Sequence, residues 1–487
     1  MKKILTFVVG ALALASCTDL EDKVYSNILA SDYPENPVQA QLLTNPAYSR
    51  LRGFADGDWW WAQELTSDLL VCPTRAGDWD DGGQFRRYHT HTWTNNDQAV
   101  VNMWNANYNV ITECNKAIEF LGSGEASKNA VAQMRVLRAF AYYILIDNFG
   151  DVPYLTSFAN APKQPTKAKR ADIYNNIITE VVASIPDLNG NSKSSVNKYT
   201  AYALLAKIYL NAGVYTGTAQ WQKAKEYCDL VIGGPYSLEA NRLAPFISEN
   251  QNSTENIFTI PYDEDNYQGF FLHRRSMHYL STATFNANTT FWNGFCAQER
   301  LVDLFETGDT RKSGLLVGPQ FSSTGSALVD PSAGGAPLVL SKEVPALNMT
   351  NSFSLVQIRM SGARLAKFEV KKGVKDNMSN DFPLFRLADF ILMKAECELR
   401  LGNVAAAKGL INQIRVVAGV PAWSDAQITL DNLLAERGRE MWCEGHRRQD
   451  LIRFGKFNDA WWEKAPDAAS NNIFPIPQSA KDTNPNL

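Results

Sequence analysis

The amino-acid sequence predicts a mostly α-helical protein, in which tetratricopeptide-like helix pairs form a scaffold and a large irregular insertion of loops and short strands interrupts it. Apolar residues recur three and four positions apart along several stretches, which is the spacing of one helix face. Two of these stretches share the same spacing of small residues, as expected for a structural repeat. Between them a long segment loses the helical period and becomes rich in Gly, Pro, Ser and Asn.

The most regular helix pair is expected after residue 386. Its first helix has apolar residues four apart, at Leu387, Ile391, Ala395 and Leu399, and Gly402 is expected to end it. Asn403 is expected to cap a second helix, whose apolar face contains Val404, Ala407, Ile411 and Ile414. The short connection between them predicts an antiparallel pair.

A second pair is expected between about residues 204 and 224. The interval from Ala206 to Gly213 equals that from Ala395 to Gly402. The interval from Trp221 to Ala224 likewise equals that from Val404 to Ala407, which predicts that both segments are one repeat. Further helices are expected at 104–121, 130–148 and 171–184.

These helices are expected to stack into a scaffold at about 100–235 and 383–455, because a lone helix pair cannot bury its apolar face. The irregular insertion is expected at about 236–382. From Ser313 to Ser341 only Asp330 is charged. We expect one domain over residues 17–487, not two independent units.

The first residues have the features of an export signal. Lys2 and Lys3 precede a short apolar run, and small residues lead to Cys17. This order resembles a bacterial lipobox and predicts a signal peptide over residues 1–16, with Cys17 as the lipidated first residue of the mature chain. Lipid chains on that cysteine would anchor the protein to a membrane without spanning it.

Composition excludes several classes of partner. The net charge of −4 becomes about −6 once Lys2 and Lys3 are removed, which argues against binding to nucleic acid. No later apolar run reaches the length of a transmembrane helix. The six cysteines after Cys17 form no C-x-x-C pair, which argues against a zinc site. Four are expected in buried helix faces, whereas Cys72 and Cys296 lie in loop-like sequence and are expected to be exposed or oxidised.

Three segments together resemble a known family. They are Arg138–Tyr143 with Phe149–Pro153, Phe385–Asp389 with Ala395–Glu396 and Ile411–Arg415, and Glu436–Gly455. With the lipobox, these motifs resemble the SusD/RagB-like outer-membrane lipoproteins of the Bacteroidetes and cover most of the chain. Phe474–Pro477 and Asn484–Asn486 also resemble the family's terminus, but members run on to a Gln-Asn-Pro-Gly-Tyr-like end, so a truncated carboxyl end is expected.

The resemblance implies a fold with four tetratricopeptide-like pairs and a role in nutrient capture. Family members hold oligosaccharide, or in some cases peptide, as a lid on a SusC-like TonB-dependent transporter. The acidic residues that follow Cys17 resemble a surface-export signal, which predicts a lipid-anchored protein on the outside of the outer membrane. Arg437, Glu440, Glu444 and Arg447 have spacings that permit pairing along one helix, so we expect them to be structural.

The distribution of tryptophan suggests where a ligand binds. Six of the twelve lie between positions 59 and 104, at Trp59, Trp60, Trp61, Trp79, Trp93 and Trp104. Sugars stack C–H groups on indole rings while amides, carboxylates and arginines bind their hydroxyls. Trp79 lies among Gly and Asp and is expected to be exposed, with Arg75 and Asp80 beside it. Trp93 and Trp104 are expected in the core, together with at least one of the consecutive tryptophans.

A second aromatic patch lies in the insertion. Tyr279 and the segment Phe291–Gly294 combine aromatic and amide groups on loops, where a rigid scaffold commonly presents binding residues. The family's ligands are also held by loops from an early and a middle region. The expected ligand-binding residues are Arg75, Trp79, Asp80, Tyr279, Trp292 and Asn293.

Three alternatives remain open at this point. A surface glycoside hydrolase would need two separated carboxylates, whereas Asp80 and Asp81 are adjacent. No motif of a hydrolase or nucleotide-binding enzyme is present, so we expect no catalysis.

A metal site is the second alternative. His89 and His91 would share a strand face, and Asp78–Gly82 faintly resembles a calcium loop that lacks its final Glu. We therefore expect no cofactor, with calcium as the alternative. A peptide-binding or purely structural member of the same family is the third, because aromatic loops also bind peptides. The identity, linkage and length of a glycan do not follow from indole stacking.

Overall fold

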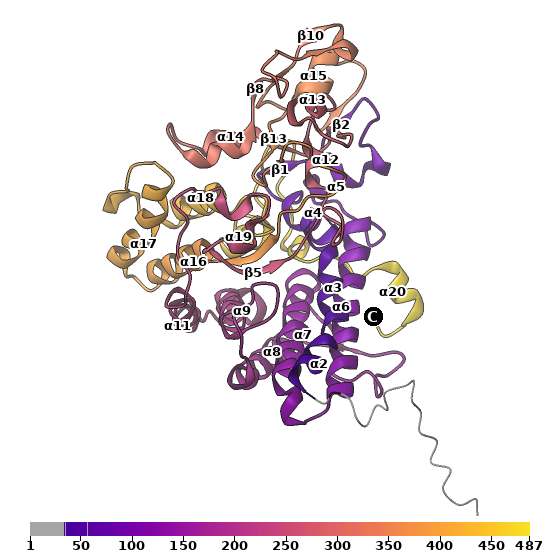
Figure 1. Cartoon of the computed structure of the whole chain (residues 1–487), viewed down its shortest axis with the longest axis vertical. Helices are drawn as coiled ribbons and strands as arrows, with labels where there is room; N and C mark the ends of the chain where they lie inside the picture. Colours follow the sequence, from indigo (N-terminus) through magenta and orange to yellow (C-terminus); the bar gives the residue numbers. More distant parts are fainter. Residues whose placement is uncertain (1–33, 35, 56) are drawn as a thin grey trace, which may run out of the picture.

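A computed structural model describes residues 34, 36–55 and 57–487. The signal peptide and Cys17 therefore lie outside the described residues. The chain forms a broad body of paired helices, from which the insertion extends as a narrower arm at the top of Figure 1. No helix in this described part combines the length and the apolar character that a membrane crossing requires.

The first half of the body consists of helices that pack in chain order. Their bounds are α2 (Pro37–Leu42), α3 (Asn45–Ser49), α4 (Asp58–Glu64), α5 (Gln84–Thr90), α6 (Gln98–Leu121), α7 (Lys128–Phe149), α8 (Arg170–Ser184), α9 (Lys198–Leu210), α10 (Ala212–Thr216) and α11 (Trp221–Ile232). The helices expected at 104–121, 130–148 and 171–184 are confirmed as α6, α7 and α8. Helix α7 packs against both α6 and α8, and it is buried on nearly all sides because most of its residues, including the continuous run Ala139–Ile146, are apolar.

The expected repeat pairs are also present. Helices α9 and α11 form one pair, α16 (Leu387–Arg400) and α17 (Val404–Val417) form another, and α11 packs against α16 so that the two pairs stack. Gly402 follows the end of α16 with φ of +86°. Asn403 stands at the amino end of α17, but its side chain donates to Glu398 and does not cap the helix. Gly213, which corresponds to Gly402 in the expected repeat, does not follow the end of a helix as Gly402 does: α9 ends at Leu210, and Gly213 lies within α10.

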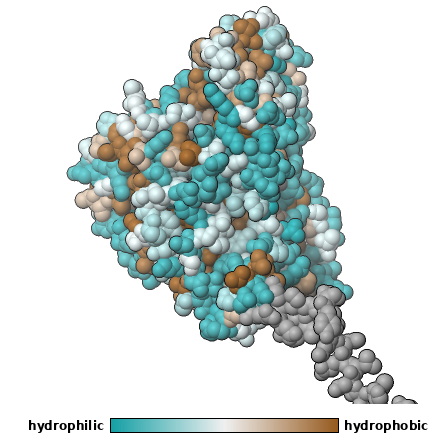
Figure 2. Space-filling view, viewed as in Figure 1, coloured by the Kyte–Doolittle hydropathy of each residue, from teal (hydrophilic) through white to brown (hydrophobic). Residues whose placement is uncertain are grey.

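The arm contains short helices and two-residue strands. Its helices are α12 (Leu272–Ser276), α13 (Ser281–Phe285), α14 (Glu299–Leu304) and α15 (Leu355–Met360), and its strands are β6 (Cys296–Ala297), β7 (Leu315–Leu316), β8 (Gly318–Pro319), β9 (Val329–Asp330), β10 (Ala336–Pro337), β11 (Val339–Leu340), β12 (Asn348–Met349) and β13 (Arg364–Leu365). Figure 2 shows hydrophobic residues at the tip of this arm and toward the α16–α18 side of a face that is otherwise mostly hydrophilic.

Strand pairs connect the arm to the body. Strand β5 (Asn256–Ile260) pairs antiparallel with β14 (Phe382–Arg386), so the two ends of the insertion meet directly before α16. Strand β1 (Leu70–Val71) pairs with β6, and β2 (Thr74–Arg75) pairs with β12. Strands β3 (Val152–Pro153) and β4 (Lys167–Ala168) pair within the body. Two early segments of the chain are thereby fixed against the insertion.

Two carboxyl-terminal helices, α18 (Leu430–Met441) and α19 (Arg447–Arg453), contribute to a buried network of charges, and a last short helix, α20 (Gln478–Thr483), follows them. Glu440 binds Arg242, Arg311 and Arg386, while Glu444 binds Arg386 and Lys367. Arg437 and Arg447 bind carboxylates of α16, α19 and the segment before β1, at Asp389, Asp450 and Asp68. The expected pairing of these motif residues along one helix is therefore wrong, because α18 ends before Glu444 and each charge meets partners from distant segments.

The cysteines of the described part of the chain are all internal. Every cysteine in the described residues is free and buried, at positions 72, 114, 228, 296, 397 and 443. The expectation of exposure at Cys72 and Cys296 is wrong, because β1 and β6 pair here and bury them among apolar residues. Burial also raises the pKa of the Cys72 thiol.

Candidate functional site

The structure brings the two predicted aromatic patches together. Trp79 and Trp292 are 213 residues apart in the chain, yet the indole Nε1 of Trp79 donates to the main-chain oxygen of Trp292 at 2.7 Å. Their ring centroids are 6.4 Å apart, and both rings are partly exposed. We call this surface the aromatic platform. It lies where β2, α5 and α12 approach each other at the base of the arm (Figure 1).

The loop that presents Trp79 is held in an unusual backbone conformation. Ala76, Trp79 and Asp81 have φ of 53°, 58° and 43°, a region that residues with a side chain rarely adopt. Three glycines of the same loop also have positive φ. Such conformations cost energy, persist only where the surroundings enforce them, and concentrate at functional sites.

Trp79 rests on a packed aromatic base. Its ring lies against Phe85 and Phe295, with centroid distances of 5.6 and 5.3 Å. Gly294 leaves the space for it, since a Cβ on Gly294 would lie 2.2 Å from the indole Cε2. Trp60 stacks on the other side of the base, 5.7 Å from Phe295. The ring of Trp79 is thus fixed from below.

Polar and charged groups surround the platform. The Tyr279 hydroxyl donates to the Asp78 carboxylate, and Arg359 lies 4.7 Å from the centre of the Tyr279 ring. Burial, followed by the bond to Asp78, raises the pKa of Tyr279 to about 12, so this hydroxyl stays protonated. Asp80 accepts from Arg86 at 2.6 Å.

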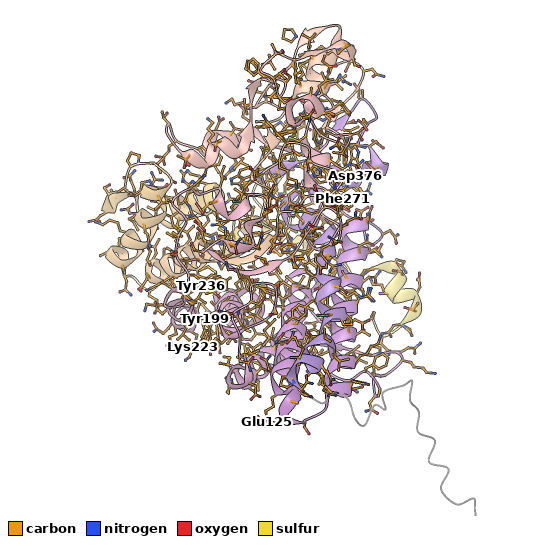
Figure 3. The ribbon with its side chains drawn as sticks, viewed as in Figure 1. Glu125, Tyr199, Lys223, Tyr236, Phe271 and Asp376 are labelled. Atoms are coloured by element: carbon orange, nitrogen blue, oxygen red, sulfur yellow. The ribbon has the colours of Figure 1, made fainter. Side chains whose placement is uncertain are left out.

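Arg274 extends the rim beside Trp292. Its guanidinium lies 4.3 Å from the centre of the Trp292 ring and bonds to Asp376 at 3.1 Å. Figure 3 labels Asp376 close to Phe271, the residue before α12. Indole rings, carboxylates and arginines therefore occur side by side on one surface, a combination suited to ligands with apolar faces and many hydroxyls.

Two predicted ligand residues lie beneath this surface. Arg75 is 3% exposed and donates to the main-chain oxygens of Ile358 and Ser361 at 2.8 and 3.0 Å. Asn293 is fully buried; its Oδ1 accepts from Arg364 and its Nδ2 donates to the main chain of Arg359 at 3.0 Å. A ligand on the surface does not reach these groups, so their role in this structure is to position the platform loops.

The other tryptophans of the early cluster are mainly structural. Trp59, Trp60 and Trp61 are all buried, as is Trp104, which agrees with the expected core positions. Trp93 is only partly buried and packs 4.6 Å from Phe474. Of the six, Trp79 is the one that belongs to the platform.

The histidines and aspartates considered as metal ligands bond to protein groups instead. His89 belongs to helix α5 and His91 follows it, so they do not share a strand face as expected. Both are buried, with hydrogen-bond partners in Trp462, Thr66 and Asp467. Asp78 and Asp80, which belong to the segment considered under the calcium alternative, bond to Tyr279 and Arg86. The described residues contain no group of three or more His, Cys, Asp or Glu arranged to hold a metal ion.

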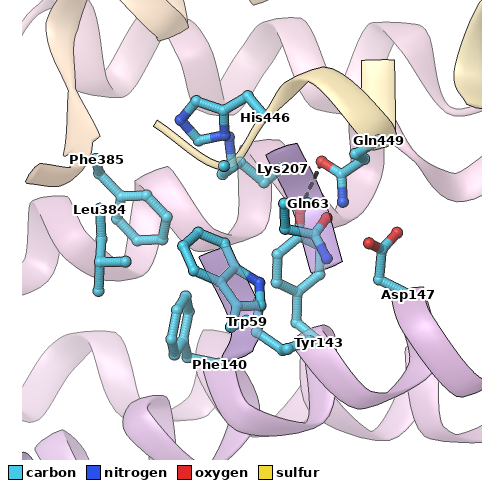
Figure 4. A pocket seen from close by; sticks show the side chains of 12 residues that line it. Trp59, Gln63, Phe140, Tyr143, Asp147, Lys207, Leu384, Phe385, His446 and Gln449 are labelled. Atoms are coloured by element: carbon cyan, nitrogen blue, oxygen red, sulfur yellow. Dashed lines mark hydrogen bonds between the residues drawn. The ribbon is translucent and has the colours of Figure 1, made fainter. Parts of the chain in front are cut away.

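A small cavity of about 20 Å³ lies in the helical body. Figure 4 shows its lining, which includes Trp59, Tyr143, Lys207, His446 and Gln449. Tyr143 donates to Gln449 at 2.8 Å, and Lys207 to Asp389 at 2.6 Å. Because Trp59, Tyr143, Lys207 and His446 are buried and the cavity is small, we assign this cavity to the core and not to a ligand site.

Sequence reasoning missed several residues of the rim, among them Asp78, Arg86, Arg274 and Asp376. Asp78 lies in the segment already singled out, so its loop composition was a usable signal. Arg274 lies five residues before Tyr279 in a basic run, and this position was a weaker signal. Arg86 and Asp376 have no local signal, because only the fold brings them to the platform.

The comparisons with known proteins agree with one another. One family model, described as the SusD family, matches residues 350–487, and another, described as starch-binding associating with outer membrane, matches residues 43–210. The chain is 28% identical over 413 residues to the starch-binding protein SusD of Bacteroides thetaiotaomicron, which covers 73% of this chain and 71% of that protein. This chain is a SusD/RagB-like protein.

Solved structures share the fold of this SusD-like chain. A laminarin-binding SusD-like protein superposes with a TM-score of 0.72 at 21% identity, over 92% of this chain and 98% of the other. A surface glycan-binding protein A of Bacteroides thetaiotaomicron, solved in complex with laminarihexaose, superposes with a TM-score of 0.71 at 21% identity, over 91% and 97%. The mostly α-helical class is thus confirmed.

Proposed function

We propose that this SusD-like chain is a cell-surface glycan-binding protein that captures oligosaccharide on the aromatic platform. The carrying observation is the junction of Trp79 and Trp292, two partly exposed indoles from distant segments held by a hydrogen bond and ringed by polar groups. Trp79, Trp292, Tyr279 and Asp80 contact the sugar in this proposal. Arg75 and Asn293 position the loops.

The relatives support this proposal by their names. They are described as starch-binding, laminarin-binding and surface glycan-binding proteins. The platform offers rings for the C–H faces of sugars and carboxylates and arginines for their hydroxyls. Such contacts need no metal, so we expect EDTA to leave the affinity for glycan unchanged.

We also propose that the chain acts at the outer membrane. One matching family model is described as associating with the outer membrane. Together with the lipobox at Cys17, this supports a lipid anchor and exposure to the medium. A protein held there would deliver captured oligosaccharide to a SusC-like TonB-dependent transporter.

Calorimetry against a panel of ligands tests the proposal. Starch, laminarin, other plant and algal polysaccharides and oligopeptides are titrated into the mature chain, and released reducing ends are measured in parallel. Binding of at least one glycan, without new reducing ends, is the expected result. Binding of peptides alone would identify a peptide-binding member of the family, and new reducing ends would identify a hydrolase.

A further inference from the structure

A cleft lies where the first helices of the body face two segments of the middle region. Its volume is about 490 Å³, which is in the size range of small-molecule sites. One wall consists of α2, α3 and the 3-10 turn η2 (Arg50–Gly53), and the other of residues from 192–195 and 259–267. We call it the Arg52 cleft. It shares no residue with the aromatic platform, and in Figure 1 α2 and α3 lie below α5 and α12.

The helical wall of the cleft presents a polar stripe. Gln41, Asn45, Tyr48 and Arg52 line it at intervals of four, three and four residues, which is the spacing of one helix face. Three serines of the loop at 192–195 place hydroxyl groups on the opposite wall. Amides, hydroxyls and an aromatic ring therefore surround the cleft, a composition suited to a ligand with many hydroxyls.

Arg52 supplies the charge of the cleft. Among the described residues that line it, only Arg52 is charged. Its guanidinium lies 4.6 Å from the centre of the Tyr267 ring. Stacking of this kind uses the flat face of a guanidinium and leaves its N–H edge free to donate. No group in the described part of the chain accepts a hydrogen bond from this edge or pairs with its charge. Arg52 is partly exposed, so a ligand in the cleft can reach it.

The free guanidinium favours an acidic ligand. The neighbouring Arg50, by contrast, pairs with Glu113 at 3.4 Å. Asp381 accepts a hydrogen bond from Thr259 of the cleft at 3.2 Å, but it is buried and does not line the cleft. A guanidinium without a partner donates two parallel, charge-assisted hydrogen bonds to a carboxylate or sulfate.

We propose that the Arg52 cleft binds an acidic sugar, whose carboxylate or sulfate pairs with Arg52 and whose hydroxyls bond to the polar stripe. The inference rests on the proposed function, since it assumes that glycans are the ligands of this chain. At the rim of the platform, Arg86 and Arg274 already pair with aspartates. The cleft would therefore give the chain a preference for acidic groups on a glycan that these paired arginines do not supply.

The test separates the cleft from the aromatic platform and acidic sugars from neutral ones. In a Trp79→Ala/Trp292→Ala background, two matched pairs of probes are titrated at millimolar concentration, cellobiouronic acid against cellobiose and glucose 6-sulfate against glucose. Calorimetry and saturation-transfer NMR measure the binding. Arg52→Gln removes the charge and keeps a long polar side chain. Arg50→Gln is the control, because Arg50 is an exposed arginine two positions away that does not line the cleft. Circular dichroism verifies the fold of each variant.

We expect at least one acidic probe to bind at least fivefold more tightly than its neutral partner, and less tightly as the salt concentration rises. Arg52→Gln should abolish this preference, whereas Arg50→Gln should leave it unchanged.

Three results would overturn the inference: no binding of either acidic probe, equal affinities within both pairs, or a preference for acid that survives Arg52→Gln. Binding of neutral glycans by the unaltered chain tests the proposed function separately, and none of these three results affects it. Failure of the unaltered chain to bind any glycan, neutral or acidic, would overturn both proposals.

Discussion

Gly294 is the residue on which the position of Trp79 depends most closely. The indole occupies the space where any other residue would place its Cβ, while the Trp79 N–H bonds to the main chain two residues earlier. The two contacts together fix the ring over Phe295. A small change at this glycine should therefore alter the platform without a change in the binding groups themselves.

Gly294→Ala is expected to displace Trp79 and to lower the affinity for glycan at least tenfold. Overpacking of this kind costs about 1–3 kcal/mol of stability. Titration calorimetry measures the affinity, and chemical denaturation measures the free energy of unfolding. Gly409→Ala is the control: Gly409 lies in α17 with no atom near its Cβ position, and this change should be neutral or slightly stabilising. Wild-type affinity in Gly294→Ala would contradict the role assigned to this glycine.

Trp79→Ala and Trp292→Ala should each weaken glycan binding at least tenfold, or about 1.4 kcal/mol, because each removes a stacking surface. Phe321→Ala, at a ring that is 48% exposed on the arm, serves as control and should leave affinity unchanged. Equal affinities of all three variants would place the glycan elsewhere.

At the scale of single residues, the sequence predicted which residues lie in this region better than it predicted whether their side chains point outward or inward. Trp79, Trp292 and Tyr279 were expected on the surface from loop composition, and they lie there. Arg75 and Asn293 have similar surroundings in the sequence but point inward, because their partners, such as Arg364 and Ser361, come from segments far along the chain. No local pattern contains that information.

Among the elements, helix α18 has the largest structural consequence. Burial alone would disfavour the charged form of Glu440. The guanidinium groups of Arg242, Arg386 and Arg311 outweigh this effect and hold the pKa of Glu440 well below its usual range. Removal of one partner from such a network leaves uncompensated buried charge. The helix thus connects the insertion, α16 and α17 through ion pairs.

Glu440→Gln should lower the free energy of unfolding by about 3–5 kcal/mol, measured by chemical denaturation at neutral pH. Asp431→Asn on the same helix is the control. Asp431 is exposed and lies 3.7 Å from Lys456, so its loss should cost less than about 1 kcal/mol. Equal effects of the two changes would show that the buried network contributes little.

The helix pairs could be predicted because their apolar period extends over many residues. The strands of the arm could not, since most contain two residues and no alternation can be recognised in so short a run. The ion-pair network also escaped prediction: spacing along a helix suggested local pairs, whereas burial brought Glu440 and Arg437 to partners on other elements.

For the whole molecule, histidine burial predicts a pH response. All five histidines are buried, and burial lowers the pKa of His89, His91, His273 and His446 to about 4 and that of His278 to about 3. The unfolded chain binds these protons near pH 6.5, the folded chain only near pH 4 or below. The contribution of these buried neutral histidines to the free energy of unfolding is complete above pH 6.5 and is lost as the pH falls toward 4.

The free energy of unfolding should therefore decrease from pH 7.5 to pH 5, as measured by chemical denaturation at several pH values. Glu64 acts in the opposite sense, because burial raises its pKa to about 7, but it is one group against five. His273→Asn should reduce the slope. A stability that is constant or rises on acidification to pH 5 would contradict this prediction.

The central claim is that Trp79 and Trp292 together form the glycan-binding surface of this SusD-like chain. The most direct measurement is a crystal structure of the mature chain with the oligosaccharide that binds most tightly in the calorimetric panel. We predict a sugar ring stacked on Trp79 or Trp292, with its hydroxyls bonded to groups of the surrounding rim. A well-ordered oligosaccharide that contacts neither indole would contradict the claim.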